Sequence, residues 1–151
     1  MAGYANVSDD FFVNMHLNTE IDLPEVLAEV TAAFNRYEKA LTTNDVAVLD
    51  DTFRVDPRTI RYGGAEILYG HEEIAAFRGA RSPAGLARTI SKTVITTYGR
   101  DFAVASTLFH RATMPGKVGR QMQSWVKFPD GWHVVAAHVS VIDEKDVWKR
   151  T

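Results

Sequence analysis

Four runs rich in β-branched and aromatic residues fill the second half of this chain, and they constrain its fold more than any other feature. They span residues 87–98, 102–113, 118–128 and 132–142, and the sequences YGRD, TMPGK and PDG separate them. Runs of this kind between short connections that contain Gly or Pro are typical of strands joined as hairpins. We therefore predict a four-stranded antiparallel meander.

The first half of the chain begins with a helical pattern. Apolar residues recur every three or four positions, which places them on one helix face; they are Val26, Val30, Phe34, Tyr37 and Leu41. Asp22 has the position of an N-cap, Pro24 suits the first turn, and Glu25 lies three residues after Asp22, as a capping box requires. Glu38 is expected to point away from the apolar face.

Shorter elements connect this helix to the meander. VAVLDDTFRV predicts a second helix, RTIRYGG and EILYG predict two short strands, and HEEIAAFRGAR predicts a third helix. This order is typical of an α+β fold in which one long, curved, mostly antiparallel sheet wraps around the first helix. We expect Tyr37 to lie close to a pocket at the open end of that sheet. The expected domain covers residues 22–142, with an extension over 1–21 and a tail over 143–151.

Composition limits the kinds of partner. The chain has 151 residues, a formal net charge of −2 and no cysteine. A charge near zero gives no global field that favours nucleic acid or an anionic membrane surface. No apolar run approaches the ~20 residues of a membrane span, and the N-terminal residues lack the basic start of a secretory signal. We expect a cytoplasmic protein that binds neither nucleic acid nor membranes.

The familiar catalytic and cofactor motifs are missing from the sequence. It contains no G-x-S-x-G, Walker, Rossmann or HExxH pattern. His71 begins an HEE sequence without a second histidine four residues later. His133 and His138 are an odd number of residues apart, so on a regular strand they face opposite sides. We therefore expect no metal and no cofactor.

Tyr37 and Arg61 form the first candidate pair. A tyrosine on a helix stripe is often a core residue whose hydroxyl has one hydrogen-bond partner, and a strand arginine is often solvated. The functional alternative is that both side chains face the same pocket. A nearby guanidinium favours the ionised phenol. Such a phenol would exchange a proton with a substrate, while the planar guanidinium binds a carboxylate.

Six other residues are candidates for substrate binding. They are Tyr69, Arg78 and Arg81 around the third predicted helix, and Arg120, His138 and Ser140 on two neighbouring strands. Each has a plainer alternative. Arginines on a helix also form surface ion pairs, as Arg78 would with Glu73, and His138 would also fit a hydrogen-bonded core position. A small anionic substrate is the ligand that these cationic and hydroxyl groups favour.

Several segments together resemble the AtzH-like family: RYEKALTTND, RTIRYGGAEILYG, IAAFRGAR, GRQMQSWV and GWHVVAAHVS. That family belongs to the nuclear-transport-factor-2-like superfamily of cone-shaped α+β domains, with a SnoaL-like and ketosteroid-isomerase-like fold. The resemblance covers roughly residues 22–142. The tyrosine and arginine implicated in the family correspond to Tyr37 and Arg61. His133 departs from the arginine expected there, and the N-terminal extension lies outside the family pattern.

The resemblance implies a bacterial enzyme that works beside an amidase-signature enzyme in the breakdown of small nitrogen compounds, such as cyanuric acid and ureides. The implied reaction converts 1,3-dicarboxyurea to allophanate, by hydrolysis or by decarboxylation, without a metal. One alternative is a non-catalytic module that binds a small acid or partners an amidase. Another is an isomerase or dehydratase of the ketosteroid-isomerase kind. That chemistry needs a carboxylate base, for which Asp50, Asp51 and Glu66 are the nearby candidates.

The superfamily also implies an oligomeric state. A homodimer packed sheet to sheet is expected by analogy. The strand face that carries Gln121, Gln123 and Trp125 is the expected interface.

Overall fold

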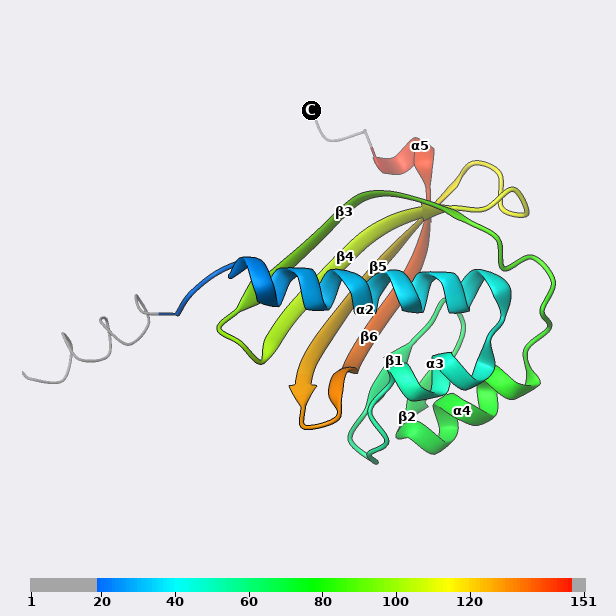
Figure 1. Cartoon of the computed structure of the whole chain (residues 1–151). Helices are drawn as coiled ribbons and strands as arrows, with labels where there is room; N and C mark the ends of the chain where they lie inside the picture. The colour runs from blue at the N-terminus through cyan, green and yellow to red at the C-terminus, as the bar shows by residue number, and fades with distance from the viewer. Residues whose placement is uncertain (1–18, 148–151) are drawn as a thin grey trace, which may run out of the picture.

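The computed structural model describes residues 19–147 and shows an α+β fold (Figure 1). The helices are α2 (Pro24–Thr43), α3 (Val46–Thr52), α4 (His71–Ala80) and the short α5 (Glu144–Val147). The strands are β1 (Ile60–Tyr62), β2 (Ile67–Tyr69), β3 (Thr89–Tyr98), β4 (Phe102–His110), β5 (Lys117–Phe128) and β6 (Gly131–Asp143). The predicted order of elements is confirmed.

The six strands form one sheet in the order β2-β1-β6-β5-β4-β3. All neighbouring strands are antiparallel except β1 and β6, which run parallel and place Arg61 opposite Ala137. The sheet is curved, and α2 lies across one of its faces, with α3 and α4 gathered beside β1 and β2 (Figure 1). The predicted fold class is therefore correct. The parallel pairing joins the RYG segment to the end of the meander, and sequence reasoning did not foresee it.

Helix α2 buries the predicted stripe, but its start differs from the prediction. Val26, Val30, Phe34, Tyr37 and Leu41 are all buried. The N-cap is Leu23, and Asp22 has a left-handed backbone with φ of 56°. The Asp22 carboxylate accepts a hydrogen bond from the backbone N–H of Thr97 at 2.9 Å. Asp22 therefore ties the start of α2 to β3 and does not form the expected capping box.

The sheet face that packs against α2 carries polar side chains as well as apolar ones. Trp125 is fully buried at its centre, and its indole Nε1 donates to Oε1 of Gln123 at 3.1 Å. Gln121 lies on the same face and is also buried. The strand face expected to form a dimer interface is thus part of the interior. The reason is that the large Trp125 ring is buried beneath α2, and strand alternation takes the two glutamines with it; the Oε1 atom of each amide accepts a hydrogen bond there.

The two ends of the chain are described only in part. The expected extension 1–21 lies mostly outside the described residues, but Ile21 forms a β-bridge with Tyr98. Within the expected tail, β6 continues to Asp143 and α5 follows it.

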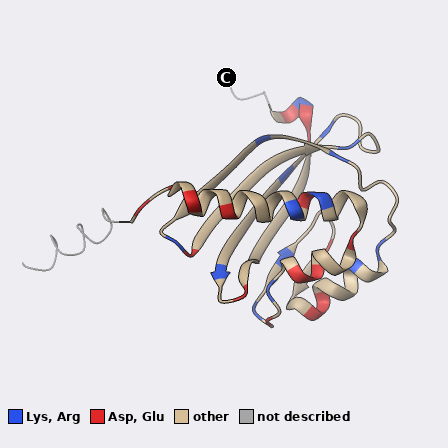
Figure 2. Cartoon of the chain, in the orientation of Figure 1, with Lys and Arg blue, Asp and Glu red and all other residues tan. Residues whose placement is uncertain are grey.

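Charged residues of both signs are interspersed over the helices and turns (Figure 2). This agrees with the net charge of −2. Within residues 19–147, no helix is long and apolar enough to cross a membrane.

Candidate active site

Tyr37 lies two-thirds of the way along α2, with its ring inside the fold. Only 2% of the residue is exposed. Its ring packs against Phe53, with centroids 6.2 Å apart. The apolar stripe of α2 explains why the ring is buried, but burial alone does not explain the charged groups around the phenol.

Arg61 reaches the same interior from β1. It is 6% exposed, whereas its strand neighbours Ile60 and Tyr62 are half-buried on the other face. Nη1 of Arg61 donates to Oε1 of Glu66 at 2.7 Å. The carboxylate lies directly against Gly63, where an added Cβ would come within 1.8 Å of Oε1. A side chain at position 63 would therefore displace the Glu66 carboxylate from its present position beside the buried arginine.

Arg78 and Arg81 are two further predicted residues that lie in this interior. Arg78 projects from α4 and is fully buried, and its guanidinium lies 5.9 Å from the Tyr37 ring and 4.9 Å from the Phe53 ring. None of its three side-chain nitrogens has a partner in good hydrogen-bond geometry within residues 19–147, although its guanidinium interacts with the Tyr37 hydroxyl. Nε and Nη2 of Arg81 are buried and unpartnered in the same way. Arg78 therefore does not form the surface ion pair that was the alternative to a role in the site.

Two further arginines belong to this interior, and sequence reasoning missed both. Arg88 is buried, ion-paired with Glu38, and donates from Nη2 to Oε1 of Gln121 at 3.0 Å. Arg111 follows β4 and has a buried, unpartnered Nε. Glu38 was expected to face solvent, but its side chain is only 13% exposed because it neutralises Arg88.

The signal that would have found Arg111 is strand alternation. Ala103, Ala105, Thr107 and Phe109 are the buried members of β4, and position 111 continues their parity. No comparable signal marks Arg88, which precedes β3 in an irregular segment.

The electrostatics of the site depend on an excess of positive charge. Burial raises the pKa of the Tyr37 phenol, but the nearby charges of Arg78, Arg61 and Arg88 outweigh burial, so the pKa lies below its ordinary value. Burial, together with the charges of neighbouring arginines, lowers the pKa of Arg81 and of Arg111. A phenol with a lowered pKa is a better proton-transfer group near neutral pH.

The ion pairs leave part of this charge uncompensated. Glu66 pairs with Arg61, and Glu38 pairs with Arg88. Among the described residues, no carboxylate lies within ion-pair distance of Arg78, Arg81 or Arg111. A fully buried guanidinium without a counter-ion, as at Arg78, costs several kcal/mol unless a ligand compensates it, and the partly buried Arg81 and Arg111 cost less. The cluster of Tyr37, Arg61, Arg78, Arg81, Arg88 and Arg111 is therefore suited to bind a small anion; we call it the arginine cluster.

The other four predicted residues lie on the opposite face of the sheet. Nε of Arg120 donates to Oγ of Ser140 at 3.1 Å, and both side chains face outward. The exposed His138 ring packs edge-on against Tyr62, whose hydroxyl hydrogen-bonds that of Tyr69. Tyr69 itself is 53% exposed. The structure does not bring Tyr69, Arg120, His138 and Ser140 to Tyr37, because strand alternation turns them away from α2.

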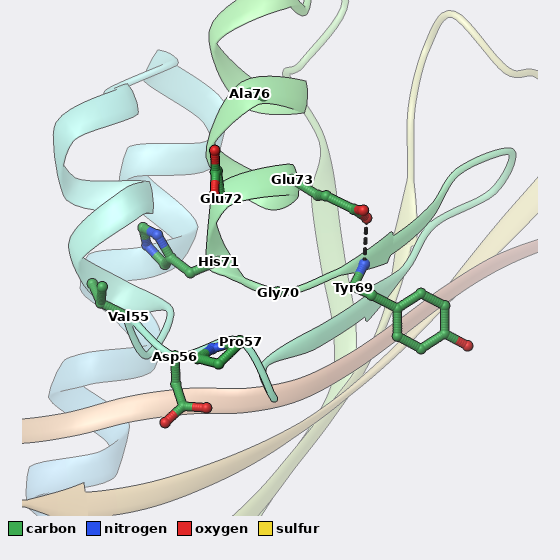
Figure 3. Close-up of a pocket in the computed structure, with 9 residues that line it drawn as sticks. All are labelled: Val55, Asp56, Pro57, Tyr69, Gly70, His71, Glu72, Glu73 and Ala76. Atoms are coloured by element: carbon green, nitrogen blue, oxygen red, sulfur yellow. Dashed lines mark hydrogen bonds between the residues drawn. The ribbon is translucent and has the colours of Figure 1, made fainter.

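A large surface pocket is separate from the arginine cluster. It has a volume of about 850 Å³ and lies at the start of α4, between Val55–Pro57 and Tyr69–Glu73 (Figure 3). Oε2 of Glu73 accepts from the backbone N–H of Tyr69 at 2.7 Å, while the Tyr69 ring points away from the pocket (Figure 3). The carboxylates that line this pocket disfavour an anionic ligand. Within residues 19–147, no group of three or more His, Asp or Glu residues is placed to hold a metal ion.

Comparison with known protein families identifies the family of this chain. The AtzH-like family matches residues 19–145, which include every member of the arginine cluster. The chain belongs to the AtzH-like family. No curated protein matches it.

Solved structures support this assignment at two levels. A protein of unknown function from Pectobacterium atrosepticum is 63% identical, with a TM-score of 0.79 over 82% of this chain and 95% of that one. A cystatin-like-fold protein from Burkholderia xenovorans is 44% identical, with a TM-score of 0.80 over 83% of this chain and 98% of that one. A putative ketosteroid isomerase from Parabacteroides distasonis is 15% identical, with a TM-score of 0.61 over 75% and 87%, and shares the fold alone.

Proposed function

We propose that this AtzH-like protein is an enzyme of nitrogen-compound catabolism that acts on N-carboxylated ureas, converting 1,3-dicarboxyurea to allophanate in the bacterial cytoplasm. One observation carries the proposal: a fully buried tyrosine is surrounded by arginines, and the nitrogens of Arg78 have no partner within the described residues. A doubly charged substrate would neutralise charge that the protein itself leaves uncompensated. This proposal takes the small anion as the substrate and requires no metal.

Binding is the first step of the proposed reaction. One carboxylate of the substrate would bind the forked donors of Arg61 and Arg78, since guanidinium groups match carboxylates in bidentate geometry. The Glu66 carboxylate already bonded to Nη1 of Arg61 holds that guanidinium in place, and Nε of Arg61 remains a free donor among the described residues.

Proton transfer is the second step. In the decarboxylation route, the N–carboxyl bond breaks, CO₂ leaves, and the electron pair stays on the urea nitrogen. Tyr37 donates its proton to that nitrogen to give allophanate, and solvent later reprotonates the phenolate. The arginines beside Tyr37 stabilise the phenolate that this step creates.

In the hydrolytic route, water adds to the carboxyl carbon before the same bond breaks, and the products are bicarbonate and allophanate. Tyr37 again supplies the proton to the departing nitrogen. The two routes differ only in the form of the released carbon. Decarboxylation gives CO₂ first, so ¹⁸O from labelled water enters it only after hydration, whereas hydrolysis puts one labelled oxygen into the first product.

The experiment that tests the function is incubation of the purified chain with 1,3-dicarboxyurea. We expect allophanate to form at a rate above the spontaneous background, together with one equivalent of CO₂ or bicarbonate. Rapid-mixing mass spectrometry in labelled water measures both products. A rate equal to the background, from protein that is folded by circular dichroism, would contradict the proposal.

A second candidate is an accessory module that captures a small acid for an amidase. It is favoured by the same unpartnered donors, which suffice for binding without any chemistry. Binding of a small acid without turnover, together with co-elution with an amidase-signature enzyme, would support it. For the isomerase alternative, the carboxylates of Glu66 and Asp51 are ion-paired with Arg61 and Arg36, which leaves Asp50 as its candidate base, with Oδ1 buried and unpartnered among the described residues.

The proposal includes a homodimer, now through the outer face of the sheet. Met122 is 58% exposed at its centre, and a shallow, largely apolar hollow of about 390 Å³ lies between β1, β6, β5 and β4. Burial of such a face favours association. Arg120, His138 and Ser140 would then lie at the interface and not in the active site.

A further inference from the structure

The arginine cluster is built from two similar arrangements of arginine around phenylalanine. Arg61 and Arg81 lie 5.5 and 6.0 Å from the Phe77 ring. Arg88 and Arg111 lie 4.5 and 5.3 Å from the Phe109 ring. Two guanidinium groups of the arginine cluster therefore lie near each ring.

Within each arrangement, one arginine is neutralised and the other is not. Glu66 pairs with Arg61, and Glu38 pairs with Arg88. The second arginine of each pair, Arg81 or Arg111, has buried nitrogen without a partner in the described residues. The glutamate neutralises the first arginine of each arrangement, and the second arginine has an N–H that is available to a ligand.

The arrangement at Phe109 offers a second donor besides Arg111. Gln121 is 2% exposed, and its Oε1 is held by Nη2 of Arg88. Its Nε2 is buried and has no partner in the described part of the chain. A buried amide N–H₂ that is left unpaired is destabilising. Arg88 therefore fixes the Gln121 amide with its donor end free.

Position 119 explains how the Phe109 ring is held in place. A Cβ added at Gly119 would come within 2.1 Å of the ring, so the ring lies flat on the backbone of β5. This contact lets the ring approach the sheet closely. It leaves the opposite side of the ring available to the guanidinium groups.

A surface cavity borders this arrangement. Its volume is about 470 Å³, and it lies between residues 87–89 and the β4–β5 connection; Arg88 and Arg111 both line it. The other two basic residues that line it are engaged, since His110 pairs with Glu144 and Lys117 with Asp143. Arg111 is therefore the basic residue of this cavity whose side chain has a buried N–H without a partner among the described residues.

We infer that Arg111 and Gln121 form a second carboxylate subsite at Phe109, reached through this cavity and distinct from the subsite of Arg61 and Arg78. The inference rests on the proposed function in one respect, namely that the ligand is a small dicarboxylate. One carboxylate occupies the Arg61 and Arg78 side, and the other occupies the Phe109 side. The subsite makes the protein select dianions over monoanions.

Glutarate is a suitable probe, because three atoms separate its carboxylates, as in 1,3-dicarboxyurea. Butyrate is the matching monocarboxylate. Isothermal titration calorimetry of the full chain is expected to give a Kd for glutarate that rises about tenfold or more in Arg111→Gln. The Kd for butyrate is expected to change less than about threefold. Arg111→Lys keeps the charge but not the fork, so an intermediate loss is expected.

Arg100→Gln is the matched control. It also removes one arginine from a turn between strands, but that arginine is exposed and pairs with Glu25. Its glutarate Kd should equal that of the parent chain. Unchanged glutarate binding in a folded Arg111→Gln variant would overturn the inference, and so would an equal loss for glutarate and butyrate.

The two experiments distinguish failure of the second subsite from failure of the proposed enzymatic function. If 1,3-dicarboxyurea is not converted but glutarate binding depends on Arg111, the subsite stands and the enzymatic role fails. If conversion is observed and glutarate binding is indifferent to Arg111, only the subsite fails.

Discussion

Replacing Tyr37 with phenylalanine is expected to lower kcat for 1,3-dicarboxyurea by about 10²–10⁴-fold, the range typical of a lost general acid. The change removes one oxygen from a ring that is packed on Phe53 and buried beneath arginines. The guanidinium donors remain, so the Kd for glutarate should stay within about threefold. A large fall in kcat with nearly unchanged binding indicates an interaction made in the transition state.

Tyr98→Phe provides the control for this substitution. Tyr98 is 41% exposed at the end of β3 and contacts Phe102. We expect its kcat to equal that of the parent chain in the same assay. A Tyr37→Phe variant that keeps full activity would remove Tyr37 from the mechanism.

Replacing Arg78 with methionine is expected to stabilise the fold while abolishing dianion binding. The Arg78 guanidinium is fully buried, and its nitrogens have no partner within residues 19–147. Replacing even a buried ion pair by apolar side chains of similar volume is often neutral or stabilising by about 1–4 kcal/mol, and a buried guanidinium without a counter-ion has no ion-pair attraction to lose. Methionine also keeps contact with the rings of Tyr37 and Phe53. A gain of 1 kcal/mol corresponds to roughly 4 °C in Tm for a chain of this size.

Two measurements check the effect of Arg78→Met. Thermal unfolding without ligand should give a higher Tm than the parent chain, and added glutarate should raise the Tm of the parent but not of the variant. Arg36→Met serves as the control, because Arg36 is exposed on α2 and pairs with Asp51; its effect should stay within about 0.5 kcal/mol. A lower Tm for Arg78→Met, or a glutarate response equal to that of the parent, would contradict the account.

The Arg78→Met variant tests a compromise between stability and ligand binding. A protein that keeps Arg78 without a counter-ion accepts lower stability in return for a preformed anion site, a relation common at functional sites. Helix periodicity places position 78 on the same face as the buried Ile74, but it cannot reveal that the charge of Arg78 has no counter-ion there.

Much of the fold was predictable because its signals are local. The stripe from Val26 to Leu41 follows helix periodicity, and the turns between the strands contain Gly or Pro. The start of α2 was not predictable, because Asp22 bonds Thr97, which is distant in sequence. The parallel pairing of β1 with β6 is non-local in the same sense.

The candidate site was predictable in part. The helix stripe and the strand pattern led to Tyr37 and Arg61, which the resemblance to the family then supported, and the density of basic residues led to Arg78 and Arg81. Which face of β5 and β6 points inward was the missing information. Trp125 settles it, and the outward direction of Arg120 follows.

A crystal structure of the full chain with glutarate would show whether the arginine cluster binds a small dianion beside Tyr37. We expect one carboxylate within hydrogen-bond distance of Arg61 or Arg78, near the Tyr37 hydroxyl. The other carboxylate should lie on the Phe109 side. Glutarate bound only on the outer face of the sheet, at Arg120, with the interior inaccessible to it, would contradict the account.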